Sequence, residues 1–106
     1  MSEPITYGAI EKALAQLGFD ITAGPDYRLY HHEGTNTVII TPDYPPEQAA
    51  EEMRLATVRK MVVERGVARR GRLERLLNNP LAVSHPVAVK KSAVRITHEI
   101  PAKVKA

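Results

Sequence analysis

Residues 27–41 constrain the fold of this chain more than any other stretch. They contain two runs rich in aromatic and β-branched residues, Tyr-Arg-Leu-Tyr-His-His and Thr-Val-Ile-Ile-Thr, on either side of a polar turn, Glu-Gly-Thr-Asn. Two such runs joined by a short turn with a glycine are typical of a β-hairpin. Pro42 ends the second run, because proline has no N–H to donate to a neighbouring strand. The sequence therefore predicts hairpin strands over residues 27–32 and 37–41.

The first of these strands presents two sets of side chains. Alternation along a strand places Tyr27, Leu29 and His31 on one face, and Arg28, Tyr30 and His32 on the other. We expect Arg28 and Tyr30 to point outward, where a guanidinium holds phosphates and an aromatic ring stacks on bases. The alternative is an ordinary cross-strand cluster against Thr37, Ile39 and Thr41 of the second strand.

Helical patterns lie on both sides of the hairpin. A helix is predicted over residues 6–17, capped by Thr6 and ended by Gly18, with Phe19 folding back on its last turn. A short strand follows at residues 20–22. After the hairpin, Pro46 suits the first turn of a second helix that runs to residue 65 and ends at Gly66. The order predicts an α+β fold, in which two helices flank a three-stranded antiparallel sheet.

The C-terminal third differs in charge from the rest of the chain. Residues 1–65 have six Lys and Arg against ten Asp and Glu, whereas residues 66–106 have nine against two. A basic segment on an acidic body indicates an anionic partner such as nucleic acid, or a contact with the acidic body of the same or a neighbouring subunit. Its densest part is the run Arg69, Arg70, Arg72 and Arg75 on a predicted short helix over residues 68–78. Four arginines so close together would contact phosphates, or would form a solvated helix face. Residues 94–100 alternate as a late strand does, which would pair with an open sheet edge in the same molecule or in a neighbour; the alternative is a segment that stays disordered until it is bound.

Composition excludes several classes of protein. A chain of 106 residues is expected to form one domain. It has no cysteine, which excludes disulfides and thiolate metal sites, and its carboxylates and histidines are scattered, so no metal and no cofactor are expected. No apolar run approaches the ~18 residues that a membrane helix needs. The first residues lack the features of a secretion signal, and a cytoplasmic location without membrane contact is expected.

Several short pieces in order resemble a known family. They are Ala-Gln-Leu-Gly-Phe at residues 15–19, the turn at Gly24 into an aromatic strand, the strand end Thr41-Pro42, and Ala-Thr-Val-Arg-Lys-Met-Val at residues 56–62. Together they make residues 5–68 similar to the HicA/YcfA-like toxins, small bacterial mRNA interferases with a double-stranded-RNA-binding-domain-like fold. The resemblance implies such a fold over residues 1–68, followed by a basic extension over residues 69–106.

The resemblance also implies an endoribonuclease, whose catalytic histidine stands in a Gly-Ser-His motif. Here the equivalent run is Gly24-Pro25-Asp26-Tyr27, so Asp26 occupies the histidine position. RNA cleavage of this type needs a group that exchanges a proton near neutral pH, which imidazole does and an ionised carboxylate does poorly. His31 and His32 are the candidates for a relocated site, although they lie about 15 Å further along the strand.

Three functions are compatible with the sequence. The first is non-catalytic binding of nucleic acid, RNA rather than DNA, through Arg28, Tyr30 and the arginine run. The second is an endoribonuclease toxin that uses His31 or His32 and is paired with an antitoxin protein. The third is a protein-interaction or assembly module, whose C-terminal extension reaches a partner or a second copy of the chain.

Overall fold

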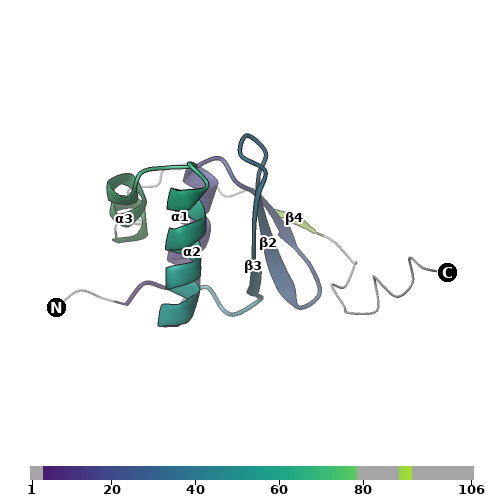
Figure 1. Cartoon of the computed structure of the whole chain (residues 1–106). Coiled ribbons are helices and arrows are strands. Elements are labelled where there is room, and N and C mark those ends of the chain that lie inside the picture. The colour runs from purple at the N-terminus through teal and green to yellow at the C-terminus, as the bar shows by residue number, and fades with distance from the viewer. Residues whose placement is uncertain (1–3, 79–88, 92–106) are drawn as a thin grey trace.

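Four strands form one mixed sheet in the part of the chain that the structure, a computed structural model, describes: residues 4–78 and 89–91. The elements are α1 (Tyr7–Gln16), β1 (Asp20–Ala23), β2 (Tyr27–His32), β3 (Thr37–Pro42), α2 (Glu52–Glu64), α3 (Arg70–Asn78) and β4 (Val89–Lys91). The helices lie on one side of the sheet, and α3 lies on the far side of α1 and α2 from it (Figure 1). The predicted α+β class is confirmed.

The sheet differs from the predicted one in its fourth strand. The three predicted strands pair antiparallel, β1 with β2 and β2 with β3. The full order is β3-β2-β1-β4, and β4 pairs in parallel with β1, with Val89 beside Ile21. The expectation of a sheet with three strands, all antiparallel, was therefore wrong. The three residues of β4 are too few to show a strand pattern. The strand predicted at residues 94–100 lies outside the described residues.

The first helix has the predicted bounds to within a residue. The Thr6 side chain accepts a hydrogen bond from the Ala9 N–H over 3.1 Å, as an N-cap does. Gly18 has a φ of +97°, and the Phe19 N–H bonds to the Leu14 carbonyl over 3.0 Å. This left-handed residue reverses the chain and returns Phe19 to the core, where its exposure is 5%.

The hairpin also follows the prediction. β2 and β3 pair from Tyr27 with Pro42 to His32 with Thr37, and four residues connect them. The turn has a positive φ at Asn36, 52°. Asparagine tolerates this conformation better than most residues with a side chain.

Alternation along β2 is as predicted, but the two faces are exchanged. The face of Arg28, Tyr30 and His32 is turned toward the helices, and Tyr30 is only 2% exposed. On β3, the same covered face has Thr37, Ile39 and Thr41, whereas Val38 and Ile40 are exposed. The covered face is the more polar of the two, but it places Tyr30 and Ile39 in the hydrophobic core. The predicted outward position of Arg28 and Tyr30 was therefore wrong.

The second helix begins six residues later than Pro46, at Glu52. The intervening segment pairs with the start of α1 instead. The N–H groups of Tyr7 and Gly8 donate to the carbonyls of Gln48 and Pro46 over 3.0 and 2.8 Å, and the Ala50 N–H donates to the Ile5 carbonyl. The Tyr7 and Gly8 bonds satisfy donors that the first turn of a helix leaves free, and the segment forms a turn at residues 46–47 and an isolated bridge between Ala49 and Thr6 in place of a helix.

The third helix belongs to the same core as the first two. Leu73 and Leu77 are 0% and 1% exposed and pack with the buried residues of α1 and α2. The hydrophobic core therefore continues past residue 68. Gly71 lowers the intrinsic stability of this short helix, and the two buried leucines hold it in place.

Candidate nucleic-acid interface

The four arginines at residues 69–75 form one surface, which we call the arginine surface: Arg69, Arg70, Arg72 and Arg75. All four side chains are exposed, and none forms an ion pair with another described residue. Leu73 and Leu77 of α3 are buried, and Arg72 and Arg75 lie on the opposite side of the helix. Arg69 precedes the helix and Arg70 is its first residue, and both are exposed at its start.

An ion pair between two helices fixes this surface to the domain. Arg59 of α2 donates to both carboxylate oxygens of Glu74 on α3, from Nε over 2.7 Å and from another nitrogen over 3.0 Å. The hydrogen bonds with Glu74 are the main reason that the pKa of Arg59 is raised. The pair also neutralises the single acidic side chain within α3, so the four arginines face no carboxylate from their own helix.

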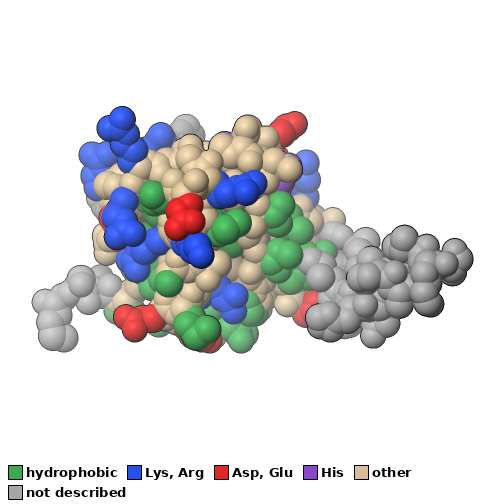
Figure 2. Space-filling view, in the orientation of Figure 1, with side chains coloured by type: hydrophobic (Ala, Val, Ile, Leu, Met, Phe, Trp, Pro, Cys, Tyr) green, Lys and Arg blue, Asp and Glu red, His purple; other side chains and the backbone are tan. Residues whose placement is uncertain are grey.

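Two hollows flank the arginine surface. One, of about 350 Å³, lies between α2 and α3, and its charged lining residues are Arg59, Lys60, Glu64 and Arg70. The other, of about 480 Å³, is lined by Arg69, Arg72 and Arg75. Lys and Arg side chains gather on the side of the molecule where α3 lies (Figure 2). No sequence pattern pointed to Lys60, because its proximity to Arg70 depends on how the two helices pack.

Arg28 has a structural partner on each side. It forms ion pairs with Glu11 of α1 and with Asp43 after β3, the latter over 3.2 Å. Partial burial alone would lower the pKa of Arg28, but the two carboxylates outweigh it and raise the pKa. Tyr30 is in the core, where burial raises the pKa of its hydroxyl. Neither residue is placed to bind a base or a phosphate on an open sheet face.

Comparison of the chain with protein-family models, with curated proteins and with solved structures found no match.

The two adjacent histidines lie on opposite faces of the end of β2. The Nε2 atom of His31 is 3.2 Å from the Asn36 side-chain oxygen. The Nδ1 atom of His32 accepts the Thr35 N–H over 3.2 Å, and its ring packs on Phe19 with 5.3 Å between centroids. The same Nδ1 atom also lies 2.9 Å from the Thr35 hydroxyl oxygen. Both rings therefore stabilise the hairpin turn.

Asp26 is exposed in the turn before β2, at the other end of that strand from the histidines. Five residues of strand separate it from His31, about 16 Å. The structure thus does not bring together the position that matches the family motif and the two imidazoles. Among the residues with described side chains there is also no group of three His, Asp or Glu that could hold a metal ion.

None of the helices in the described ranges is both long and apolar enough to cross a bilayer.

Proposed function

We propose that this chain binds RNA through the arginine surface, without cleaving it. The observation that carries the proposal is the set of four exposed arginines within seven residues, on and just before a helix that Leu73 and Leu77 anchor in the core, and free of ion pairs with other described side chains. Arginine binds phosphate oxygens through two N–H groups at once. Several such groups close together contact neighbouring phosphates, and each contact adds salt-dependent affinity.

The preference for RNA over DNA rests on the resemblance of residues 5–68 to the HicA/YcfA-like toxins. The order of the first elements supports this preference: a helix, three antiparallel strands and a second helix. A double-stranded-RNA-binding domain has the same order. In this proposal α3 is an added basic element beside that unit. The distance between Asp26 and the histidines favours binding over an endoribonuclease activity.

The test compares two variants that lose the same charge. In the first, Arg69, Arg72 and Arg75 are all replaced by Gln. In the second, the control, three exposed lysines away from α3 are replaced by Gln: Lys12, Lys90 and Lys91. Fluorescence anisotropy with a short RNA duplex, a DNA duplex and single-stranded RNA gives the affinities across a salt series.

We expect the arginine variant to bind the RNA duplex at least tenfold more weakly. A plot of log K against log salt concentration should also become less steep, by about one unit of slope for each phosphate that the arginines no longer neutralise. The lysine variant should bind nearly as well as the natural sequence. Equal losses in the two variants would mean that only net charge matters, and the proposal would fail. Tighter binding of DNA than of RNA would contradict the preference for RNA.

Protein association is a second candidate function. In the described part of the sheet β3 has one neighbour, and its outer face exposes Val38 at 42% and Ile40 at 44%. An exposed apolar edge strand is a typical place for another strand to add. Light scattering of the full chain beside an Ile40→Lys variant tests this function. A dimer that dissociates in the variant would support it, and two monomers would contradict it.

A further inference from the structure

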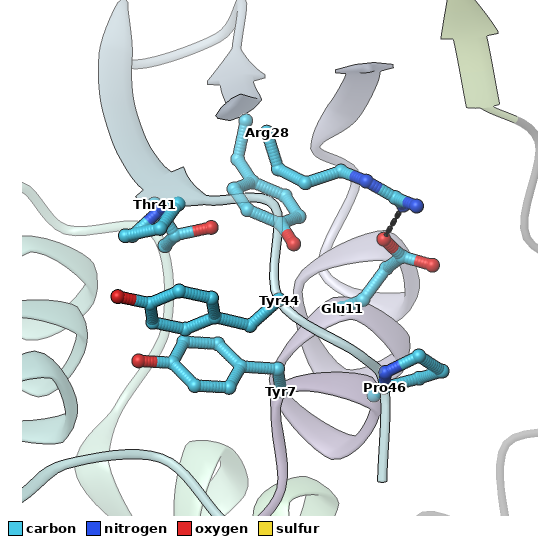
Figure 3. Close-up of a pocket in the computed structure, with 9 residues that line it drawn as sticks. Tyr7, Glu11, Arg28, Thr41, Tyr44 and Pro46 are labelled. Carbon is cyan, nitrogen blue, oxygen red and sulfur yellow. Dashed lines mark hydrogen bonds and ion pairs between the residues drawn. The ribbon is translucent and has the colours of Figure 1, made fainter. Parts of the chain in front are cut away.

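A small cavity opens between the start of α1, the ends of β2 and β3 and the loop after β3 (Figure 3). Its volume is about 80 Å³, and three tyrosines line it: Tyr7, Tyr30 and Tyr44. One water needs about 10–15 Å³ by the same measure, so the cavity has room for a group of a few heavy atoms. Glu11 and Arg28 form its other polar wall, joined by their ion pair.

Two hydroxyls in the cavity wall have no hydrogen-bond partner. The Tyr7 hydroxyl and the Thr41 Oγ1 are buried, and the two residues are only 5% and 2% exposed. Thr41 lies close enough to the Tyr30 hydroxyl to lower its pKa slightly, but the pair does not reach hydrogen-bond geometry. A buried hydroxyl without a partner is costly, so both atoms are available to whatever occupies the cavity.

The charges around the cavity disfavour an anion. Arg28 is the single cation among the lining residues, and the carboxylates of Glu11 and Asp43 both bind it. Glu11 is the single carboxylate that lines the cavity, and Asp43, outside the lining, gives the three groups one negative charge in excess. The rings of Tyr7 and Tyr44 meet edge to face, with 5.2 Å between centroids, and the negative faces of tyrosine rings attract cations. Hydroxyl oxygens and a carboxylate are acceptors, which a cation with N–H groups satisfies.

We propose that this cavity binds a small organic cation that donates hydrogen bonds, of the primary ammonium or guanidinium class. The Tyr7 and Thr41 oxygens accept its N–H groups, and Glu11 balances its charge. Tyr44 is 40% exposed and lines the cavity on its solvent side, where the ligand would enter. The site is separate from the arginine surface and would bind its ligand whether or not the chain binds RNA.

The test is an NMR titration of the ¹⁵N-labelled full chain with methylammonium chloride. Sodium chloride and tetramethylammonium chloride at equal concentration are the controls, because the first lacks an organic cation and the second lacks N–H groups. We expect saturable shifts of the Gly8, Glu11 and Thr41 amides with methylammonium alone. Equal shifts with either control salt, or shifts that never saturate, would overturn the proposal and leave a cavity filled by water.

Two variants locate the contact. Tyr7→Phe and Thr41→Val each remove one acceptor and keep the shape of the side chain, and we expect each to weaken binding about tenfold, the loss of one hydrogen bond to a charged group. Thr57→Val is the matched control, since the Thr57 hydroxyl bonds to the Met53 carbonyl on the exposed side of α2, away from the cavity lining. Thermal unfolding shows which variants are folded. Unchanged binding in both cavity variants would overturn the proposal.

The same titration distinguishes a free amine from the side chain of a partner protein. Its further arms use guanidinium chloride at millimolar concentration, N-acetyl-lysine amide and N-acetyl-arginine amide. Tighter binding of the blocked amino acids than of the free cations would indicate a lysine or arginine of a partner. The reverse order would indicate a small free ligand, and binding of none of these compounds would contradict the proposed class.

Discussion

Arg59 and Glu74, fifteen residues apart in sequence, form a two-point ion pair that joins α2 to α3. Both side chains are about one-third exposed, at 32% and 31%. At that exposure solvent screens the charges, and a pair of this kind contributes about 1 kcal/mol or less. Its effect on geometry is larger than its effect on stability, because the parallel N–H groups of the guanidinium fix the orientation of the carboxylate and of the helix that carries it.

Replacing Glu74 by Gln is therefore expected to loosen α3 more than it destabilises the domain. The free energy of unfolding should fall by about 0.5–1 kcal/mol in urea titrations. Amide hydrogen exchange within α3 should become faster while exchange in the hairpin stays unchanged. Glu33→Gln, at an exposed position in the hairpin turn, is the control. Equal protection of α3 in both variants would show that the ion pair does not hold the helix.

The two faces of α3 differ in burial, and two leucines measure the difference. Leu73 has 0% exposure, so Leu73→Ala leaves a cavity in the core and should cost about 2–5 kcal/mol. Leu76 is only partly buried, and Leu76→Ala should cost roughly 1 kcal/mol. Both substitutions have the same effect on helix propensity. Similar losses in chemical unfolding would mean that α3 does not pack on the core as described.

The sequence was most informative where a local rule determines the structure. Thr6, Gly18 and Gly66 mark helix ends through their own backbone and side-chain chemistry, and each was predicted at its position. A short helix was likewise predicted over residues 68–78, and α3 spans Arg70–Asn78. Such signals act over a few residues and need no knowledge of what packs nearby.

Tertiary contacts decided the features that the sequence did not show. Alternation along β2 was clear, but which face is covered depends on α1, and Arg28 faces inward because Glu11 is there to pair with it. The start of α2 was placed too early because Pro46 and Gln48 pair with the first turn of α1. The unpartnered hydroxyls of the cavity have no sequence signature either, since Tyr7 and Thr41 meet only in the folded chain.

Alkaline pH should reveal the burial of Tyr30. Burial, and then the nearby Glu11 carboxylate, raise the pKa of its hydroxyl above the value near 10 of an unfolded chain. The contribution of Tyr30 to the free energy of unfolding is therefore complete below pH ~10. It is lost as the pH rises above that value, because the hydroxyl then releases its proton in the unfolded chain and keeps it in the folded one. The loss reaches about 1.4 kcal/mol per pH unit. Urea titrations from pH 8 to pH 11 should show this slope, and Tyr30→Phe should lack it. Identical slopes in the two proteins would contradict the burial.

Replacing each of the two adjacent histidines by alanine should lower stability by different amounts. Neither replacement should change RNA binding or RNA integrity. His32→Ala removes the bond from the Thr35 N–H and the ring contact with Phe19, and should cost roughly 1–3 kcal/mol. His31→Ala removes one bond to the exposed Asn36 and should cost less than about 1 kcal/mol. Chemical unfolding measures both, and anisotropy with the RNA duplex should give unchanged affinities at the arginine surface.

Neither substitution should alter the integrity of RNA incubated with the protein, because neither ring is placed as a proton carrier. Cleavage by the natural chain that His31→Ala abolishes without loss of stability would instead assign that ring to catalysis.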